Sequence, residues 1–262
     1  MAGGNDSATA IGLAFILGFP RSGTTLLGQI LASQANVAVF EEMPMLGRAI
    51  ADFVLNKEGP ARLAAAPQDE LEFYRSDFWR RIRATGVAIQ GKFVVEQTAL
   101  NTAYLSVIRG LFPDAPIIFA VRDPRDVVFS CFRRLFGPNQ FTVEFRTLES
   151  TAQLYDKMMR YAETCRDTLG FRPLEIRNED LIADFDRETK RLCAHLGLEW
   201  TPSLRDYHTA LTDTILTTYS AAQVRRGLSR DGVGQWRRYR AEMEPVLPLL
   251  RPWVERFGYP PD

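Results

Sequence analysis

The amino-acid sequence predicts an α/β fold in which helices cover both faces of a central, mainly parallel sheet. Short, continuously apolar segments, typical of strands buried on both faces, alternate with segments whose apolar residues recur at helical spacing. Strands and helices in alternation form parallel βαβ units. Neither an internal repeat nor a low-complexity linker interrupts the 262 residues, so we expect a single domain over 1–262.

The first strand is expected at 13–19, where an apolar run is closed by Pro20 and Gly23. A helix follows from Thr24, because the next leucines and isoleucine fall on one helical face. Further apolar runs predict strands at 37–40, 92–95, 116–121 and 174–177. The periodicity elsewhere predicts helices at 101–111, 124–136, 148–168, 185–196 and 240–257.

The composition indicates an ordinary globular protein, with 46% hydrophobic and 24% charged residues. Lys plus Arg and Asp plus Glu number 32 each, which gives no argument for non-specific binding to nucleic acid or membranes. Three widely spaced cysteines and two histidines offer no metal-ligand motif, and they fit a reducing, cytoplasmic location without a metal. The apolar run at 11–19 is too short to span a membrane.

The segment Gly18–Thr25 joins the first strand to a helix N-terminus, where free backbone N–H groups and the helix dipole favour an anion. Its spacing matches the nucleotide-binding pattern GxxxxGK[ST] as far as Gly23, but Thr24 replaces the lysine. That lysine helps to neutralise the phosphates of ATP, so its loss disfavours a kinase. The simpler alternative is a strand-to-helix turn without a ligand. The side chains that could hold one phosphate group without a metal are Arg21, Ser22, Thr24 and Thr25.

A second candidate site begins at Arg122, directly after the strand at 116–121. Ser130 lies about two helical turns further along, and Arg134 lies one more turn along the same face. Together these side chains could clamp a second phosphate group. The alternative is a surface helix whose arginines pair with Asp123 and Asp126.

The segment 220–239 lacks clean periodicity and carries several basic and hydroxyl side chains. This pattern predicts either a loop that covers a bound ligand or a solvated basic loop. Trp236 is interpreted as core packing.

In order and spacing, these motifs resemble the family of sulfotransferases that use 3′-phosphoadenosine-5′-phosphosulfate (PAPS), from about Leu13 to Trp236. The segment 19–27 is similar to the family's 5′-phosphosulfate loop. It is closest to the form found in tyrosylprotein sulfotransferases and in bacterial sulfotransferase domains attached to tetratricopeptide repeats. The segments 122–134 and 220–229 resemble the 3′-phosphate motif and the carboxy-terminal cofactor loop. The resemblance implies a fold like that of P-loop NTPases, and it implies PAPS-binding roles for Arg21, Ser22, Gly23, Thr24, Thr25, Arg122, Ser130, Arg134, Ser220, Arg226 and Ser229.

Sulfuryl transfer also needs a base for the acceptor proton and a positive charge near the transferred group. Glu42 ends the second strand and matches the glutamate base of tyrosylprotein sulfotransferases, so we predict Glu42 as the base and Arg21 as the catalytic cation; an exposed acidic strand end is the alternative. Three positions depart from the family pattern: Gln97 replaces a lysine, Asn178 replaces a tyrosine, and Gln235 occupies a position of the cofactor loop that is often lysine. Removing one charge-stabilising group typically costs about 10²–10³ in rate.

The expected activity is therefore transfer of a sulfuryl group from PAPS to an acceptor hydroxyl, with release of 3′,5′-adenosine bisphosphate (PAP). The alternatives are a PAPS-binding protein with weak or no turnover and, less favoured, a small-molecule kinase. Carbohydrate, peptide tyrosine, lipid and small aromatic alcohol all stay open as acceptors, and so does the oligomeric state. Apolar residues at helical spacing in 43–89 could line an acceptor cleft or form part of the core.

Overall fold

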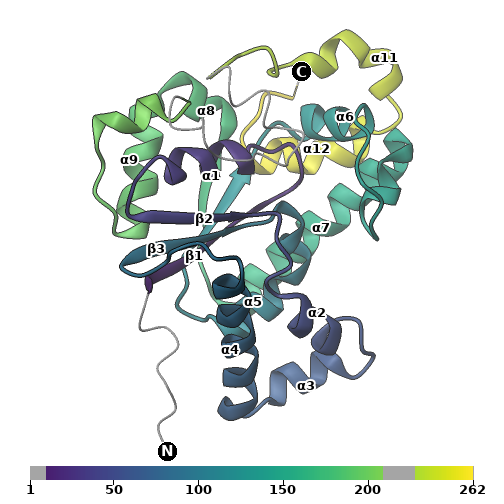
Figure 1. The fold of residues 1–262 in the computed structure, drawn as a ribbon. Helices are drawn as coiled ribbons and strands as arrows, with labels where there is room; N and C mark the ends of the chain where they lie inside the picture. Colours follow the sequence, from purple (N-terminus) through teal and green to yellow (C-terminus); the bar gives the residue numbers. More distant parts are fainter. Residues whose placement is uncertain (1–9, 209–227, 262) are drawn as a thin grey trace, which may run out of the picture.

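A five-stranded parallel sheet forms the centre of the computed structural model, which describes residues 10–208 and 228–261 (Figure 1). The spatial order of the strands is β2-β3-β1-β4-β5, and each neighbouring pair is parallel. All five predicted strands are confirmed. The strands are β1 (Ala10–Gly18), β2 (Val37–Glu41), β3 (Lys92–Gln97), β4 (Ile117–Val121) and β5 (Leu174–Arg177).

Helices cover both faces of the sheet, which confirms the predicted three-layer α/β class. The α-helices of the described residues are α1 (Thr24–Ala32), α2 (Gly47–Phe53), α3 (Gly59–Ala65), α4 (Gln68–Ala84), α5 (Leu105–Leu111), α6 (Pro124–Phe132), α7 (Leu148–Leu169), α8 (Asn178–Ala183), α9 (Phe185–Leu196), α11 (Arg240–Met243) and α12 (Leu247–Arg256). The 3-10 helices are η1 (Ala99–Tyr104), η2 (Thr142–Arg146), η3 (Pro202–Asp206) and η5 (Gln235–Tyr239).

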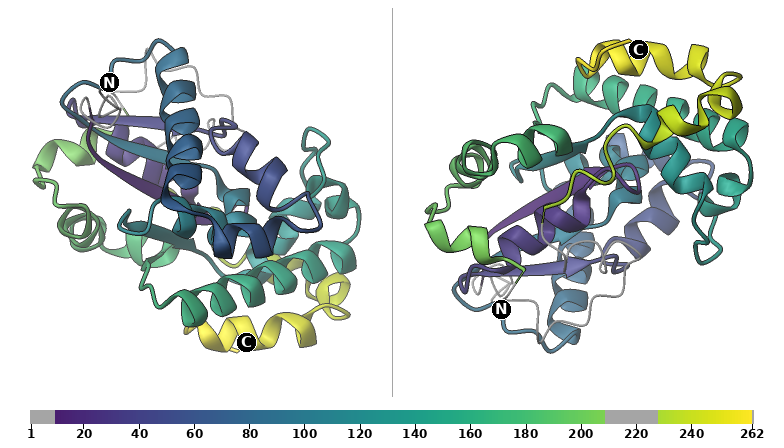
Figure 2. Two further views of the ribbon diagram at one scale, coloured as in Figure 1. Left: turned by 90° about the horizontal axis from the view of Figure 1, so that it is seen from below. Right: turned by 90° about the horizontal axis from the view of Figure 1, so that it is seen from above.

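The side chains on the two faces of β1 belong to two separate hydrophobic cores. Phe15 and Leu17 pack with α4, α5 and α7, whereas Ala14 and Ile16 pack with α1 and α9. All four side chains are fully buried, which is why this strand is apolar at successive positions instead of alternating. Figure 2 shows α12 beside α7 and α6, so the C-terminal part of the chain belongs to the same layer as these helices.

Two helices end before the periodicity predicts. α6 ends at Phe132, which leaves Arg133 and Arg134 beyond its last turn. The helix expected over 240–257 is interrupted at 244–246, because Pro245 has no N–H group to donate to a helical hydrogen bond.

The carboxyl ends of the strands meet at one edge of the sheet, the usual binding edge of such folds. Arg21 and Glu42 both lie at this edge. They are also the described non-glycine residues with positive φ, at 72° and 51°. Such backbone conformations are uncommon for residues with a Cβ atom and gather at functional sites.

Candidate active site

The turn between β1 and α1 has the backbone of an anion cradle. Gly23 is the N-cap of α1 with a φ of 108°, a left-handed conformation that suits glycine, and it has no side chain to cap the first N–H groups of the helix. A Cβ atom at Gly18 would lie 2.6 Å from Ser22 Oγ and 2.7 Å from the carbonyl oxygen of Ala120, so glycine is required there. The buried Ser22 hydroxyl has no hydrogen-bond partner among the described residues, which leaves it available to a ligand.

Two side chains hold this loop from beneath. Thr102 Oγ1, fully buried in η1, accepts a hydrogen bond from the N–H of Gly18 (2.9 Å) and lies 2.6 Å from the carbonyl oxygen of the same residue. Cys131 Sγ on α6 donates to the carbonyl oxygen of Pro20 (3.2 Å). Thr102 was missed by the sequence reasoning, because nothing in its local pattern shows that η1 returns to the loop.

A cavity of about 300 Å³ lies beside the loop, and we call it the arginine pocket. Arg21 Nε donates to Ser130 Oγ (3.0 Å), and Arg122 Nη1 donates to the carbonyl oxygen of Arg21 (3.1 Å). The structure therefore brings together the two predicted phosphate motifs, which lie about a hundred residues apart. The residues that line the pocket are Arg21, Arg122, Ser130, Arg133, Arg134, Gly232 and Gln235.

The electrostatics of the arginine pocket favour an anion. Among residues 10–208 and 228–261, four guanidinium groups and no carboxylate line it. Burial, and then the positive charges of Arg122 and Arg134, lower the pKa of Arg21 to about 10. A negatively charged group bound in the pocket would relieve the repulsion between these guanidinium groups. Clustered arginines bind phosphate groups in other proteins in the same way.

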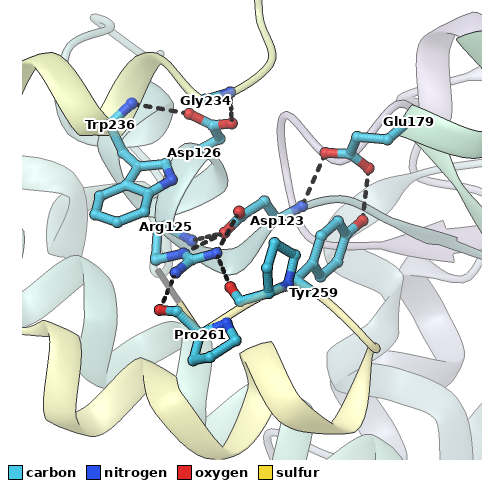
Figure 3. A network of polar contacts seen from close by, with 9 residues as sticks. Asp123, Arg125, Asp126, Glu179, Gly234, Trp236, Tyr259 and Pro261 are labelled. Carbon is cyan, nitrogen blue, oxygen red and sulfur yellow. Dashed lines mark hydrogen bonds and ion pairs between the residues drawn. The ribbon is translucent and has the colours of Figure 1, made fainter.

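The acidic residues at the start of α6 do not neutralise these arginines through direct ion pairs. Asp123 caps α6 and binds Arg125 instead, with Oδ2 2.8 Å from Arg125 Nη2 (Figure 3). Asp126 accepts hydrogen bonds from backbone N–H groups of the 232–236 segment. Arg122 donates to the carbonyl oxygens of Arg21 and Gly232, so the alternative of a surface helix with Arg–Asp pairs does not describe this residue.

The predicted C-terminal site residues have different outcomes. Ser220 and Arg226 lie outside the described residues. Ser229 is exposed, accepts from the N–H of Asp231 (3.0 Å) and does not line the arginine pocket. Trp236 is 0% exposed, which confirms its interpretation as core packing.

Gly232 is a pocket residue that the sequence reasoning missed. A Cβ atom added there would lie 3.0 Å from Arg122 Nη2. A glycine shortly after the basic run was the available signal, but only the fold shows that Arg122 approaches it so closely.

Glu42 lies where a general base is predicted. Its N–H donates to the carbonyl oxygen of Gln97 (2.9 Å), which fixes the end of β2 against β3. Solvent reaches the side chain, yet surrounding protein atoms desolvate the carboxylate and raise its pKa to about 7; a backbone hydrogen bond at Ala99 opposes the shift. A base with a pKa near the working pH suits proton abstraction from a hydroxyl group.

Glu96 is a second carboxyl group near this edge, and the sequence reasoning did not single it out. It is 0% exposed and accepts hydrogen bonds from Thr98 Oγ1 (2.5 Å) and Asn101 Nδ2 (3.0 Å). Burial, together with the charge of Glu42, raises its pKa to about 8. The available signal was a glutamate inside an otherwise apolar strand.

Of the departures from the family pattern, Gln235 lines the arginine pocket, and Gln97 and Asn178 lie close to the loop between β1 and α1. Gln97 is 0% exposed, and neither end of its amide has a hydrogen-bond partner among the described residues. Its Oε1 would lie 2.8 Å from a Cβ atom at Gly28, which places the side chain against α1. Asn178 Oδ1 would lie 3.1 Å from a Cβ atom at Gly23, at the first turn of α1.

Within residues 10–208 and 228–261, no group of three or more His, Cys, Asp or Glu side chains is arranged to hold a metal ion. None of the helices in this described part of the chain has the length and apolar character needed to cross a membrane.

Comparison with known proteins identifies the class. Residues 14–202 match the model of the sulfotransferase family, which is well over half of the chain, so the protein belongs to that family. An uncharacterized protein of Aquifex aeolicus is 24% identical over 253 residues, covering 94% of this chain and 33% of the relative. Omega-hydroxy-beta-dihydromenaquinone-9 sulfotransferase Stf3 of Mycobacterium tuberculosis is 27% identical over 179 residues, covering 63% and 45%. The chain thus matches less than half the length of these curated relatives.

Solved structures share the fold over nearly the whole chain. The sulfotransferase domain of the Synechococcus PCC 7002 olefin synthase has a TM-score of 0.61 at 20% identity and covers 96% of both chains. A mouse sulfotransferase complexed with PAP has a TM-score of 0.54 at 16% identity, covering 92% of this chain and 85% of the mouse chain. At these identities the likeness shows the sulfotransferase fold, which confirms the predicted fold class.

Proposed function

We propose that this protein transfers a sulfuryl group from PAPS to an acceptor hydroxyl. The observation that carries the proposal concerns the turn formed by residues 18–25, which we call the phosphate loop. It is joined to the arginine pocket by the hydrogen bond between Arg21 and Ser130. The ribose of PAPS carries a phosphosulfate group at its 5′ position and a phosphate group at its 3′ position, so the nucleotide needs two anion sites close together at one edge of the sheet. The complex of the mouse relative with PAP supports this choice of nucleotide.

In the proposed reaction, the acceptor oxygen attacks the sulfur atom while the bond between sulfur and the bridging phosphate oxygen breaks. The electron pair of that bond stays on the phosphate of the PAP product, and Glu42 takes the proton of the acceptor. Arg21 and the N–H groups at the start of α1 stabilise the negative charge that develops on the leaving phosphate.

The nucleotide is held through both of its phosphate groups. Ser22, Gly23, Thr24 and Thr25 hold the 5′-phosphosulfate group together with Arg21, whereas Arg122 and Ser130 bind the 3′-phosphate with help from Arg134. The arginines supply the positive charge that a metal ion supplies in many phosphoryl-transfer enzymes.

The acceptor class is a separate part of the proposal. The mycobacterial relative is named for a hydroxylated menaquinone, so hydrophobic alcohols are the first acceptors to screen. The resemblance of the loop to tyrosylprotein sulfotransferases makes tyrosine peptides the second set.

Calorimetric titration with PAP in the absence of Mg²⁺ tests the nucleotide assignment. We expect tight binding to the wild type, much weaker binding of 5′-AMP and a loss of PAP affinity in Arg122→Ala. Removing a hydrogen-bonded charge partner typically weakens such binding by about tenfold or more. A folded wild type that does not bind PAP would overturn the proposal.

Gln97 favours a second candidate function, a PAPS-binding protein of the same fold with little turnover. A buried glutamine brings no charge to the position where the family usually has lysine. A single-turnover assay with bound PAPS and a panel of acceptors separates the two candidates. Sulfuryl transfer in the Gln97→Lys variant, together with none in the wild type, would favour the second.

A further inference from the structure

One wall of the arginine pocket is made by a segment that is distant in sequence from the other walls. Gly232 and Gln235 line the pocket together with residues of the phosphate loop and of the α6 region. Arg122 Nη2 donates to the carbonyl oxygen of Gly232, so the position of this segment also fixes the position of Arg122. We call residues 232–236 the covering segment.

One carboxylate of α6, that of Asp126, accepts two hydrogen bonds from the backbone of the covering segment. Asp126 Oδ2 accepts from the N–H of Gly234 (2.6 Å), and Asp126 Oδ1 accepts from the N–H of Trp236 (3.0 Å) (Figure 3). Asp126 is 1% exposed, so water does not compete for these bonds. Both oxygens are used, and they hold the segment on either side of Gln235.

Asp123 and Asp126 both lie at the start of α6, but they make different contacts. Asp123, three residues earlier, satisfies Arg125, whose guanidinium group lies 4.3 Å from the ring centroid of Trp236. Asp126 instead accepts its hydrogen bonds from backbone N–H groups of the covering segment. Asp123 therefore holds the side chain of Arg125, whereas Asp126, about one helical turn later, holds the backbone of the covering segment.

Resting on the function proposed above, we propose that Asp126 is a positioning residue for the 3′-phosphate of the nucleotide. Its carboxylate holds the covering segment closed over the arginine pocket, and the carbonyl oxygen of Gly232 then holds Arg122 in place to receive the phosphate. The 5′-phosphate is bound by the turn between β1 and α1, whereas the hydrogen bonds of Asp126 go to Gly234 and Trp236.

The chemistry requires two acceptor atoms. An asparagine in the same place offers one oxygen and turns an NH₂ group toward the second N–H, so it loses one bond and adds a donor–donor contact. A glutamate keeps both oxygens but moves them by one methylene group. Both variants should therefore lose or lengthen at least one of the hydrogen bonds from the N–H groups of Gly234 and Trp236.

The test compares the affinities for PAP and 5′-AMP in wild type, Asp126→Asn and Asp126→Glu by calorimetry. The ratio of the two affinities isolates the 3′-phosphate. We expect Asp126→Asn to lower this ratio by about tenfold, which is the usual effect of losing one hydrogen bond to a charged group, and Asp126→Glu to lower it less. The affinity for 5′-AMP is expected to change by less than about threefold in both variants.

Tyr259→Phe is the matched control. The Tyr259 hydroxyl donates to Glu179 Oε2 (2.6 Å) in the same polar network, but it does not contact the covering segment (Figure 3). This variant should lose comparable thermal stability and keep the wild-type ratio. An unchanged ratio in whichever Asp126 variant folds would overturn the inference, whereas a wild type that binds no PAP would overturn the proposed function instead.

Discussion

Replacing Glu96 with glutamine tests whether the sheet contains a neutral carboxyl group. Burial raises the pKa of Glu96 to about 8 from an ordinary 4.5. Between these values the folded protein holds a proton that the unfolded chain has lost, so this contribution to stability is complete below about pH 4.5 and disappears as the pH rises through about 8. At ~1.36 kcal/mol for each pH unit, the whole loss amounts to about 5 kcal/mol.

Glutamine preserves the contacts and removes the titration. Its Oε1 can accept the hydrogen bonds of Thr98 Oγ1 and Asn101 Nδ2, as the carboxyl oxygen does. We expect the difference in unfolding free energy, Glu96→Gln minus wild type, to rise by about 4 kcal/mol between roughly pH 5 and pH 8.

Urea denaturation followed by circular dichroism measures this difference. Glu42 also titrates in this range, but it is present in both proteins and largely cancels. If the difference stays constant within about 1 kcal/mol across the range, Glu96 is ionised in the folded protein and the reasoning is refuted.

Three further predictions concern the site. Glu42→Gln should lower kcat by about 10²–10⁴ with unchanged PAP affinity. Since the base must be ionised and its pKa is about 7, the wild-type rate should rise with pH up to that value and then level off; a flat profile contradicts this role. Gly232→Ala should weaken PAP by about tenfold but not 5′-AMP, because the new Cβ atom lies 3.0 Å from Arg122 Nη2; equal affinity in calorimetry speaks against the pocket. Turnover should persist in EDTA, because Arg21 and Arg122 supply the positive charge, and loss of activity that Mg²⁺ restores would contradict this.

Local pattern predicted most of the fold. A parallel strand buried on both faces is continuously apolar, and this allowed all five strands to be located; β5 and α9 begin and end where expected. The errors came where one residue outweighs periodicity, as at Pro245, whose missing N–H group divides the last helix.

The candidate site was only partly predictable. Three site residues could be predicted because they belong to local sequence motifs: Arg21, Arg122 and Ser130. Glu96 and Thr102 contribute through contacts with residues on other elements, and neither has a local pattern that distinguishes it from a structural residue.

By itself, the sequence determined the parallel α/β class, the phosphate loop and the existence of a second basic motif, because each depends on spacing along a continuous stretch of chain. Only the tertiary structure decided that Arg21 bonds to Ser130, that Gly232 completes the arginine pocket, and that Asp126 holds the covering segment in place. These contacts join residues more than a hundred positions apart, and α6 creates them because it contacts both the turn between β1 and α1 and the segment around η5.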